Sequence, residues 1–146
     1  MIADNVAPSQ APAPLDLDFV VARDDAACEA LVDINAAAYR MSLDGCKTVM
    51  ARHAFWQPHV PVLGLMNGTP VTCAAVLGID GHRYVAWVAT LPSHQRRGMA
   101  DAAMRHALRV AHDRGDGGPT VLHATDAGKP VYEPMGYRTI STHTLF

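Results

Sequence analysis

The residues with the clearest chemical meaning in this sequence lie in one turn, residues 90–100, which reads TLPSHQRRGMA. The turn follows an apolar run, residues 84–89, and opens a helical pattern. The first N–H groups of a helix have no partner inside it, and the helix dipole adds positive potential at the same end. Together with the charges of Arg96 and Arg97, these groups predict a site for an anion.

Two small residues in the same turn leave room for a ligand at the backbone. Gly98 has no side chain and tolerates positive φ, so the chain can approach a bulky group closely. Ala100, two positions later, is also small, and a larger side chain there would crowd a pyrophosphate. The turn therefore suits a large phosphorylated ligand.

Length and composition limit the class of protein. The chain has 146 residues, 49% of them apolar, which predicts one globular domain with one core. No apolar run reaches the roughly 20 residues of a membrane helix, so we expect no membrane partner. The net charge is −2 and lysine occurs only at Lys47 and Lys129, which argues against a nucleic-acid surface.

The cysteines indicate a reducing compartment. They are three in number, widely spaced and without a CxxC pair, which favours free thiols in a cytoplasm over a disulfide scaffold or a zinc site. The three cysteines are Cys28, Cys46 and Cys73. Each also suits a buried position that needs a small hydrophobic side chain.

The elements that position the turn follow from hydrophobic periodicity. Residues 1–14 are rich in alanine and proline and are expected to be a disordered lead-in, so the single domain is predicted to span residues 15–146. A strand is expected over residues 15–22, and Asp24 can cap a helix that runs to about Arg40. The predicted core positions of this helix are Ala27, Ala30, Leu31, Ile34, Ala38 and Met41.

A second, less regular helix is predicted over residues 46–55, and strands follow it. Two dipeptides that tolerate positive φ, Asn67-Gly68 and Asp80-Gly81, separate three apolar runs and predict three consecutive antiparallel strands. The helix after the anion-binding turn has an unbroken apolar stripe at Ala100, Ala103, Met104, Ala107, Leu108 and Ala111. Charged residues four apart on another side of it, including Arg105 and Arg109, indicate a solvated face.

The last third of the sequence predicts a strand that follows the long helix, which makes a β-α-β crossover connection. A strand is expected over residues 120–124, a short helix over 131–135 that stops at Gly136, and a final strand over 137–146. The order is β-α-α-β-β-β-α-β-α-β, which predicts an α/β fold with a mixed, mostly antiparallel sheet and helices on both faces.

Two segments carry a family resemblance. QRRGMA, between the predicted fourth strand and third helix, resembles the acyl-CoA signature of the GCN5-related N-acetyltransferase (GNAT) family. HATDAGKPVYEPMGY, further along, is similar to the family's strand, loop and short helix, with Tyr132 four residues before Gly136. With the element order, the resemblance covers residues 15–146.

The resemblance implies roles for particular residues. Members of the family thread the pantetheine of acetyl-CoA between two splayed strands, which here implies main-chain contacts at Val88, Ala89 and Thr90. It implies that Tyr132 protonates the departing thiolate, although the same position suits a half-buried packing aromatic. The pyrophosphate is expected on the backbone amides of Gln95, Arg96, Arg97, Gly98, Met99 and Ala100.

The proton acceptor is not identified by the resemblance. Members often use a glutamate, but the only glutamates are Glu29 and Glu133, and neither lies on the predicted fourth strand. Imidazole titrates near neutrality, so His123, His53 or His59 could replace it, although each also suits an ordinary surface or packed position.

The sequence departs from the family in two places. Thr125 and Asp126 stand in the loop where members commonly have asparagine, and little chain is left for a seventh strand. The last sheet edge is therefore expected to be open, and an open edge can be completed by a second subunit in a homodimer.

The expected function is acetyl-CoA-dependent transfer of an acetyl group to a primary amine, with acetyl-CoA as cosubstrate and no metal. The acceptor is expected to be a small molecule of unspecified class; Tyr39, Phe55 and Trp56 would suit an aromatic one but also suit a packed core. The alternative is a catalytically silent module that binds acyl-CoA as a sensor or through a partner, which the scarcity of glutamate favours.

Overall fold

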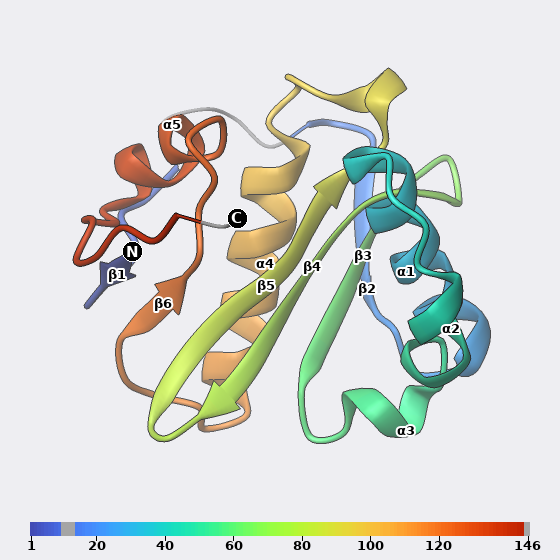
Figure 1. Cartoon of the computed structure of the whole chain (residues 1–146), viewed down its shortest axis with the longest axis horizontal. Helices are drawn as coiled ribbons and strands as arrows, with labels where there is room; N and C mark the ends of the chain where they lie inside the picture. The colour runs from blue at the N-terminus through green and yellow to red at the C-terminus, as the bar shows by residue number, and fades with distance from the viewer. Residues whose placement is uncertain (10–13, 145–146) are drawn as a thin grey trace.

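The chain folds around one six-stranded sheet, seen in a computed structural model that describes residues 1–9 and 14–144 (Figure 1). The spatial order is β1-β6-β5-β4-β3-β2, and every neighbouring pair is antiparallel except β5 and β6, which are parallel. The strands are β1 (Ile2–Ala3), β2 (Leu17–Val21), β3 (Val60–Met66), β4 (Thr69–Ile79), β5 (His82–Thr90) and β6 (Thr120–Leu122). The predicted α/β class and mixed sheet are confirmed.

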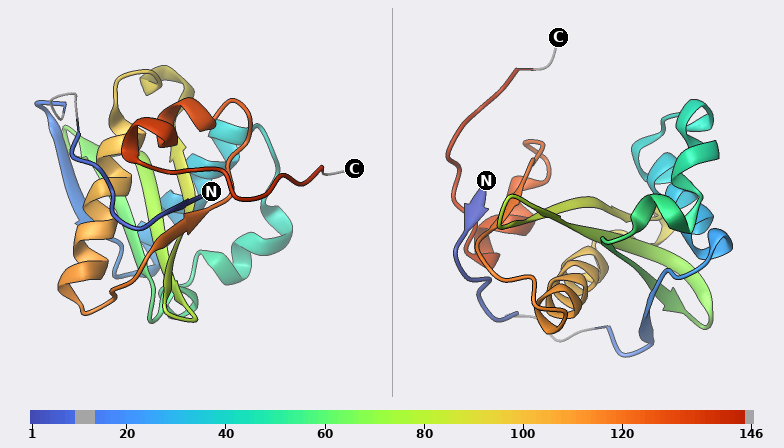
Figure 2. Two further views of the ribbon diagram at one scale, coloured as in Figure 1. Left: turned by 90° about the vertical axis from the view of Figure 1, so that its left-hand side faces the viewer. Right: turned by 90° about the horizontal axis from the view of Figure 1, so that it is seen from below.

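Helices cover both faces of this sheet (Figure 2). On one face α4 packs against the side chains of β3, β4 and β5, and on the other face α1 packs against β4 and β5. None of the helices in the described part of the chain is long and apolar enough to cross a membrane. The helices are α1 (Asp25–Tyr39), α2 (Asp44–Met50), α3 (His53–Trp56), α4 (Met99–Asp113) and α5 (Lys129–Tyr132), with 3₁₀ turns η1 (Pro92–His94) and η2 (Glu133–Met135).

Local signals set the ends of α1. Asp24 accepts a hydrogen bond from the Ala27 amide at 2.8 Å, as an N-cap does, and Arg40 ends the helix in the left-handed conformation. The helix buries Leu31 and Ile34 as predicted. Met41 lies beyond the helix end and is 52% exposed, so its predicted core position is wrong.

The two hairpins and the stripe of α4 also form as predicted. The dipeptides Asn67-Gly68 and Asp80-Gly81 have positive φ at all four residues, which is the geometry of tight two-residue turns. In α4, the stripe residues Ala103, Met104, Ala107, Leu108 and Ala111 are buried against the sheet. Ala100 is only partly buried because it lies in the first turn.

The N-terminal segment does not behave as a disordered lead-in. Ile2 and Ala3 form β1, which pairs with Val121 and Thr120 of β6, and the Met1 amine donates to the Leu122 carbonyl at 2.7 Å. Pairing of this kind uses the backbone N–H and C=O that every residue except proline carries, so the overall composition of the segment does not reveal it. The part of the predicted lead-in over residues 10–13 lies outside the described residues.

The predicted final strand over residues 137–146 is wrong for the described part of that range. Only Arg138 pairs, in a two-way backbone bridge with Ile2 at 2.9 Å, and residues 139–144 form no helix or strand. In the structure β1 pairs with β6, and Arg138 only bridges to β1. The homodimer hypothesis rested on the open edge of the last strand, and the described residues 139–144 form no such strand.

Candidate functional site

The site is organised by a bulge in β5. Cys73 pairs with Ala89 and Ala75 pairs with Ala86, so two residues of β5 lie opposite the single residue Ala74. One of the two, Trp87, has a positive φ of 55°. A bulge of this kind bends the strand and increases its twist, which turns the end of β5 away from a neighbouring strand.

The strand it turns away from is β6. The parallel pairing covers only three residue pairs, from Arg83 with Thr120 to Val85 with Leu122. Beyond them β5 continues to Thr90, whereas β6 ends and the chain leads to α5. Residues 86–90 of β5 thus have no β6 partner among the described residues, and we call this part of the strand the open edge of β5.

Backbone alternation decides which groups face the open edge. The Leu91 amide donates to the Val71 carbonyl at 2.9 Å, on the β4 side, so the backbone groups of Thr90 and Val88 point to the opposite side. The carbonyl of Ala89 accepts from Thr72 Oγ1 at 2.9 Å on the β4 side. Among the three expected main-chain contacts, Val88 and Thr90 therefore face the open edge and Ala89 does not.

Two side chains already occupy carbonyls at this edge. Tyr39 Oη, at the end of α1, donates to the Val88 carbonyl at 2.9 Å, and Gln95 Nε2 donates to the Thr90 carbonyl at 3.1 Å. Gln95 thus closes the turn after β5 with its side chain. The Tyr39 bond joins residues 49 positions apart, and nothing in the local sequence around Tyr39 signals it.

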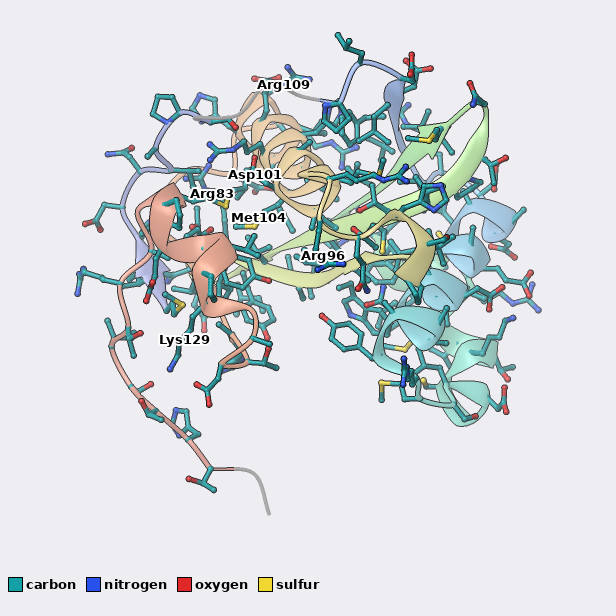
Figure 3. All side chains as sticks on the ribbon, turned by 90° about the horizontal axis from the view of Figure 1, so that it is seen from above. Arg83, Arg96, Asp101, Met104, Arg109 and Lys129 are labelled. Carbon is teal, nitrogen blue, oxygen red and sulfur yellow. The ribbon has the colours of Figure 1, made fainter. Side chains whose placement is uncertain are left out.

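The turn after β5 has the geometry of an anion site. Arg96 and Gly98 have positive φ values of 61° and 73°, and the first intrahelical bond of α4 runs from the Ala102 amide to the Gly98 carbonyl. The amides of residues 99–101 therefore precede the helical hydrogen-bond pattern. Figure 3 looks onto this end of the molecule and shows Arg96 beside the start of α4.

The charges and small residues of this turn are distributed as the sequence predicts. Arg96, Arg97 and Gly98 are exposed, while the side chain of Met99 is buried and leaves only its backbone for a ligand. A Cβ built at Gly98 would meet nothing within 4 Å, so the space above this glycine is open. Open backbone, the helix dipole and two exposed guanidinium groups together fit a pyrophosphate.

Tyr132 lies on the other side of the divergence, at the end of α5. Its ring contacts the ring of Tyr137 edge-on, with centroids 6.0 Å apart, and packs over Gly128, whose Cβ position is 3.3 Å from Tyr132 Cε2. Burial, with smaller contributions from Tyr39 and Tyr137, raises the pKa of Tyr132 to about 12. The hydroxyl is therefore protonated at neutral pH and can donate.

The loop that departs from the family pattern has its own structural bonds. Thr125 Oγ1 accepts from the Gly128 amide at 3.1 Å, which supports the start of α5. Asp126 pairs with Lys129 at 2.9 Å, and this pairing lowers the pKa of the Asp126 carboxyl. These two residues stabilise the loop that presents Tyr132.

The three candidate histidines lie in different places. His53 is bound through its amide to Asp25 at the start of α1, and the His59 carbonyl contacts Arg114 just past the end of α4. Both lie toward the end of the sheet opposite the anion-binding turn. His123 immediately follows β6, and its Nδ1 is 2.9 Å from Tyr84 Oη.

Among the described residues, few other side chains near the open edge of β5 could accept a proton or bind a metal. Neither glutamate is at the open edge of β5, since Glu29 pairs with Lys47 on the outer side of α1 and Glu133 is exposed in η2. Within residues 1–9 and 14–144, no cluster of three His, Cys, Asp or Glu side chains could hold a metal ion. The chemical groups that remain are backbone amides, tyrosine hydroxyls and one histidine.

Known structures share this architecture. GCN5-related N-acetyltransferase from Kribbella flavida matches with a TM-score of 0.71 and 27% identity over 94% of this chain and 52% of that one, so this chain spans about half of its length. A predicted acetyltransferase from Clostridium acetobutylicum, solved with acetyl-CoA, has a TM-score of 0.71 at 19% identity, covering 89% and 96% of the two chains. AAC(6')-Iy, solved with the bisubstrate analog CoA-S-monomethyl-acetylneamine, has a TM-score of 0.71 at 11% identity, covering 89% and 96%.

Sequence comparison identifies the family directly. No curated protein matches significantly. The family model described as acetyltransferase (GNAT) family matches residues 28–137, which include most of α1, the bulge, the anion-binding turn and Tyr132. Since this match covers well over half of the sequence, the chain belongs to the acetyltransferase (GNAT) family.

Proposed function

We propose that the chain is an acetyl-CoA-dependent N-acetyltransferase that acts on a primary amine of a small-molecule acceptor. The observation that carries the proposal is the divergence of β5 from β6, which leaves the Val88 and Thr90 amides without a β6 partner and ends at the anion-binding turn. The ligands in the structures of two neighbours, acetyl-CoA and a CoA-based bisubstrate analog, support a CoA thioester as the ligand here.

In this proposal the open edge of β5 binds the pantetheine arm. The amides of Val88 and Thr90 donate to it, as an added strand would receive hydrogen bonds from an unpaired edge. The pyrophosphate lies on the turn and contacts the backbone of residues 95–100, where Arg96 and Arg97 add charge and Gln95 keeps the turn closed. This arrangement holds the thioester carbonyl next to the bulge.

The chain needs few groups for the reaction itself. Acetyl-CoA supplies the activated acyl group. Positioning of the amine against the thioester is the main contribution of the protein, and a strand amide near the bulge stabilises the oxygen that becomes negative. Tyr132 gives its proton to the sulfur as the C–S bond breaks and recovers a proton from water.

The alternative of a silent acyl-CoA-binding module is favoured by one observation, namely that both glutamates lie away from the open edge. It predicts binding of acetyl-CoA without turnover. The enzyme hypothesis predicts binding and turnover. The acid role proposed for Tyr132 favours the enzyme, because a module that only binds acyl-CoA does not need an acid beside the sulfur.

The test is release of free CoA thiol from acetyl-CoA, measured with a panel of amines that covers amino acids, arylalkylamines, polyamines and aminoglycosides. We expect thiol release above the hydrolysis rate with at least one class. A rise in Tm with acetyl-CoA but no thiol release across the panel would favour the silent module. Neither a rise in Tm nor thiol release would contradict both.

A further inference from the structure

A tyrosine and a histidine form a bonded pair next to the open edge of β5. Tyr84 Oη lies 2.9 Å from His123 Nδ1, and the two rings meet edge-on with centroids 5.7 Å apart. Tyr84 belongs to β5, whereas His123 directly follows β6. The pair therefore bridges the two strands that diverge.

The position of the pair along the strands is at the start of the divergence. Tyr84 pairs with Val121, and the last β5–β6 pair is Val85 with Leu122. His123 is thus the first residue after the pairing ends. A thioester held next to the bulge at Trp87 would have His123 on the neighbouring chain segment.

The side of the sheet on which the pair lies also matters. Val85 and Leu122 are buried in the core under α4, so the adjacent Tyr84 and His123 point to the opposite face. Leu77, the cross-strand partner of Tyr84, packs in the cluster on the α1 side. The anion-binding turn leads into α4, so the phosphates of acetyl-CoA lie toward the α4 side of the sheet in the proposed function. An acceptor that enters from the α1 side would then meet His123 before it meets the thioester.

The reaction requires a proton acceptor at this place. An amine that arrives as an ammonium ion cannot attack until it loses a proton, and no glutamate is available at the open edge. An imidazole can accept this proton near neutral pH. The bond to Tyr84 fixes the ring and, when Nδ1 carries the hydrogen and the Tyr84 oxygen accepts it, leaves Nε2 as the basic nitrogen.

One further titratable group faces His123. The ring of His143, in the C-terminal segment, lies with its centroid 6.5 Å from that of His123, and its Nε2 is 3.1 Å from Ser141 Oγ. The described surroundings of the His123 ring thus include Tyr84 from β5 and His143 from the C-terminal segment.

We propose that His123 is the proton acceptor for the acceptor ammonium and that Tyr84 is the positioning residue that holds its ring; this rests on the proposed N-acetyltransferase function. His123 Nε2 takes one proton from R–NH₃⁺, and the freed amine forms the C–N bond to the acyl carbon. The C–S bond breaks with its electron pair on sulfur, which takes the Tyr132 proton. The nitrogen loses its second proton to water, and His123 and Tyr132 return to their starting states by exchange with water.

The experiment compares two acceptors of similar shape, one that is an ammonium ion at pH 7 and one weakly basic amine that is already neutral. We expect His123→Asn to lower kcat/KM by about 10² to 10⁴-fold for the ammonium acceptor, the usual value of a general base, and to change it little for the neutral amine. Tyr84→Phe should give a smaller loss with the same preference and shift the acidic limb of the kcat/KM profile. His82→Asn, an exposed histidine on the β4–β5 hairpin whose Nδ1 contacts the Asp80 carbonyl, is the matched control and should leave both acceptors unaffected.

Binding of acetyl-CoA separates this proposal from the function on which it rests. All three variants should keep the parent's rise in Tm with acetyl-CoA, since none lies in the anion-binding turn. If His123→Asn keeps full activity, or loses the same factor with both acceptors, the assignment of His123 is overturned while the N-acetyltransferase function stands. If the parent protein shows neither binding nor turnover, the proposed function fails and this assignment fails with it.

Discussion

The two long edges of β5 differ in how completely their backbone groups are used. On the β4 side the strand is paired from His82 to Thr90 except at the bulge, and Thr72 adds side-chain bonds to the Ala89 carbonyl and to Thr90 Oγ1. On the β6 side only three residue pairs form before the strands part. The same strand is thus paired to β4 on one edge and lacks a β6 partner over residues 86–90 on the other.

The bulge at Trp87 makes this difference compatible with a stable sheet. It lets β5 bend away from β6 while β4 follows the bend through a shift in register. The edge of β5 that pairs with β4 is here called the closed edge. It is buried, with Thr72 of β4 at 0% exposure, so it holds the open edge in a fixed geometry. Binding groups that are already in place lose little conformational entropy when a ligand arrives. Substitutions at the open edge should therefore change binding and rate, and those at the closed edge should change stability.

The largest effect is expected in the anion-binding turn that follows the open edge, in Gly98→Val. A β-branched side chain at φ 73° would lie where the ligand approaches the backbone. Parent protein with acetyl-CoA at a hundredfold excess over Kd should gain about 2.7 kcal/mol of stability, and the variant should gain none of it. Thermal unfolding with and without acetyl-CoA measures this.

Gly68→Val is the matched control for backbone strain. Gly68 also has positive φ, 79°, and also has nothing within 4 Å of its Cβ position, but it lies in the β3–β4 hairpin. Both variants should lose about 1–2 kcal/mol in the absence of ligand because of the left-handed backbone. If Gly98→Val folds and gains the same stability from acetyl-CoA as the parent, the anion-binding turn has been placed wrongly.

The second effect is on turnover, in Tyr132→Phe. Loss of a general acid should lower kcat at least about tenfold with acetyl-CoA affinity nearly unchanged, because the ring remains. Steady-state kinetics on an acceptor from the amine panel, with a direct measurement of acetyl-CoA Kd, tests both parts.

Tyr137→Phe is the control for this position. The Tyr137 hydroxyl is buried and bonded to Thr120, so its removal should cost about 1 kcal/mol of stability and leave kcat near the parent value. A Tyr132→Phe variant with full kcat would show that Tyr132 is structural and that water delivers the proton to sulfur.

The third effect is on stability alone, in Thr72→Val at the closed edge. The substitution keeps the shape of the side chain but leaves the Ala89 carbonyl and Thr90 Oγ1 without the Thr72 hydroxyl. We expect a loss of about 1–3 kcal/mol in the free energy of unfolding, measured by denaturant titration. The exposed Thr69→Val, on the same strand, should change this quantity little. A Thr72→Val variant of parent stability would mean that the closed edge does not hold β5 as described.

The smallest effect is expected in Arg105→Ala, on the side of α4 away from the sheet. Arg105 pairs with Asp101 at 2.9 Å and also donates to the Ala7 carbonyl. A partly exposed ion pair of this kind contributes about 0–1 kcal/mol, and acetyl-CoA affinity should stay at the parent value. An affinity loss as large as that of Gly98→Val would instead include Arg105 in the binding site.

Features that depend on neighbours in the sequence could be predicted from it. The cap at Asp24, the two hairpin dipeptides and the buried stripe of α4 each depend on residues within a few positions of one another. The anion-binding turn belongs to this group, because glycine, arginines and a helix start occur together in residues 95–100. Tyr132 was identified by resemblance to the family, and its role stays a prediction.

The remaining features were decided by contacts between distant segments. The pairing of β1 with β6 joins residues more than a hundred positions apart, and the bulge at Trp87 is a mismatch of register between β4 and β5. The bonds of Tyr39 to Val88 and of Tyr84 to His123 span 49 and 39 positions. Backbone pairing is nearly independent of side-chain type, and the register of a long-range pair follows from how the whole sheet packs. The sequence by itself therefore determined the cap of α1, the buried stripe of α4, the hairpins and the turn. It predicted one helix over residues 46–55, where the structure has α2 and α3. Only the tertiary structure decided which edge of β5 is open and which side chains face it.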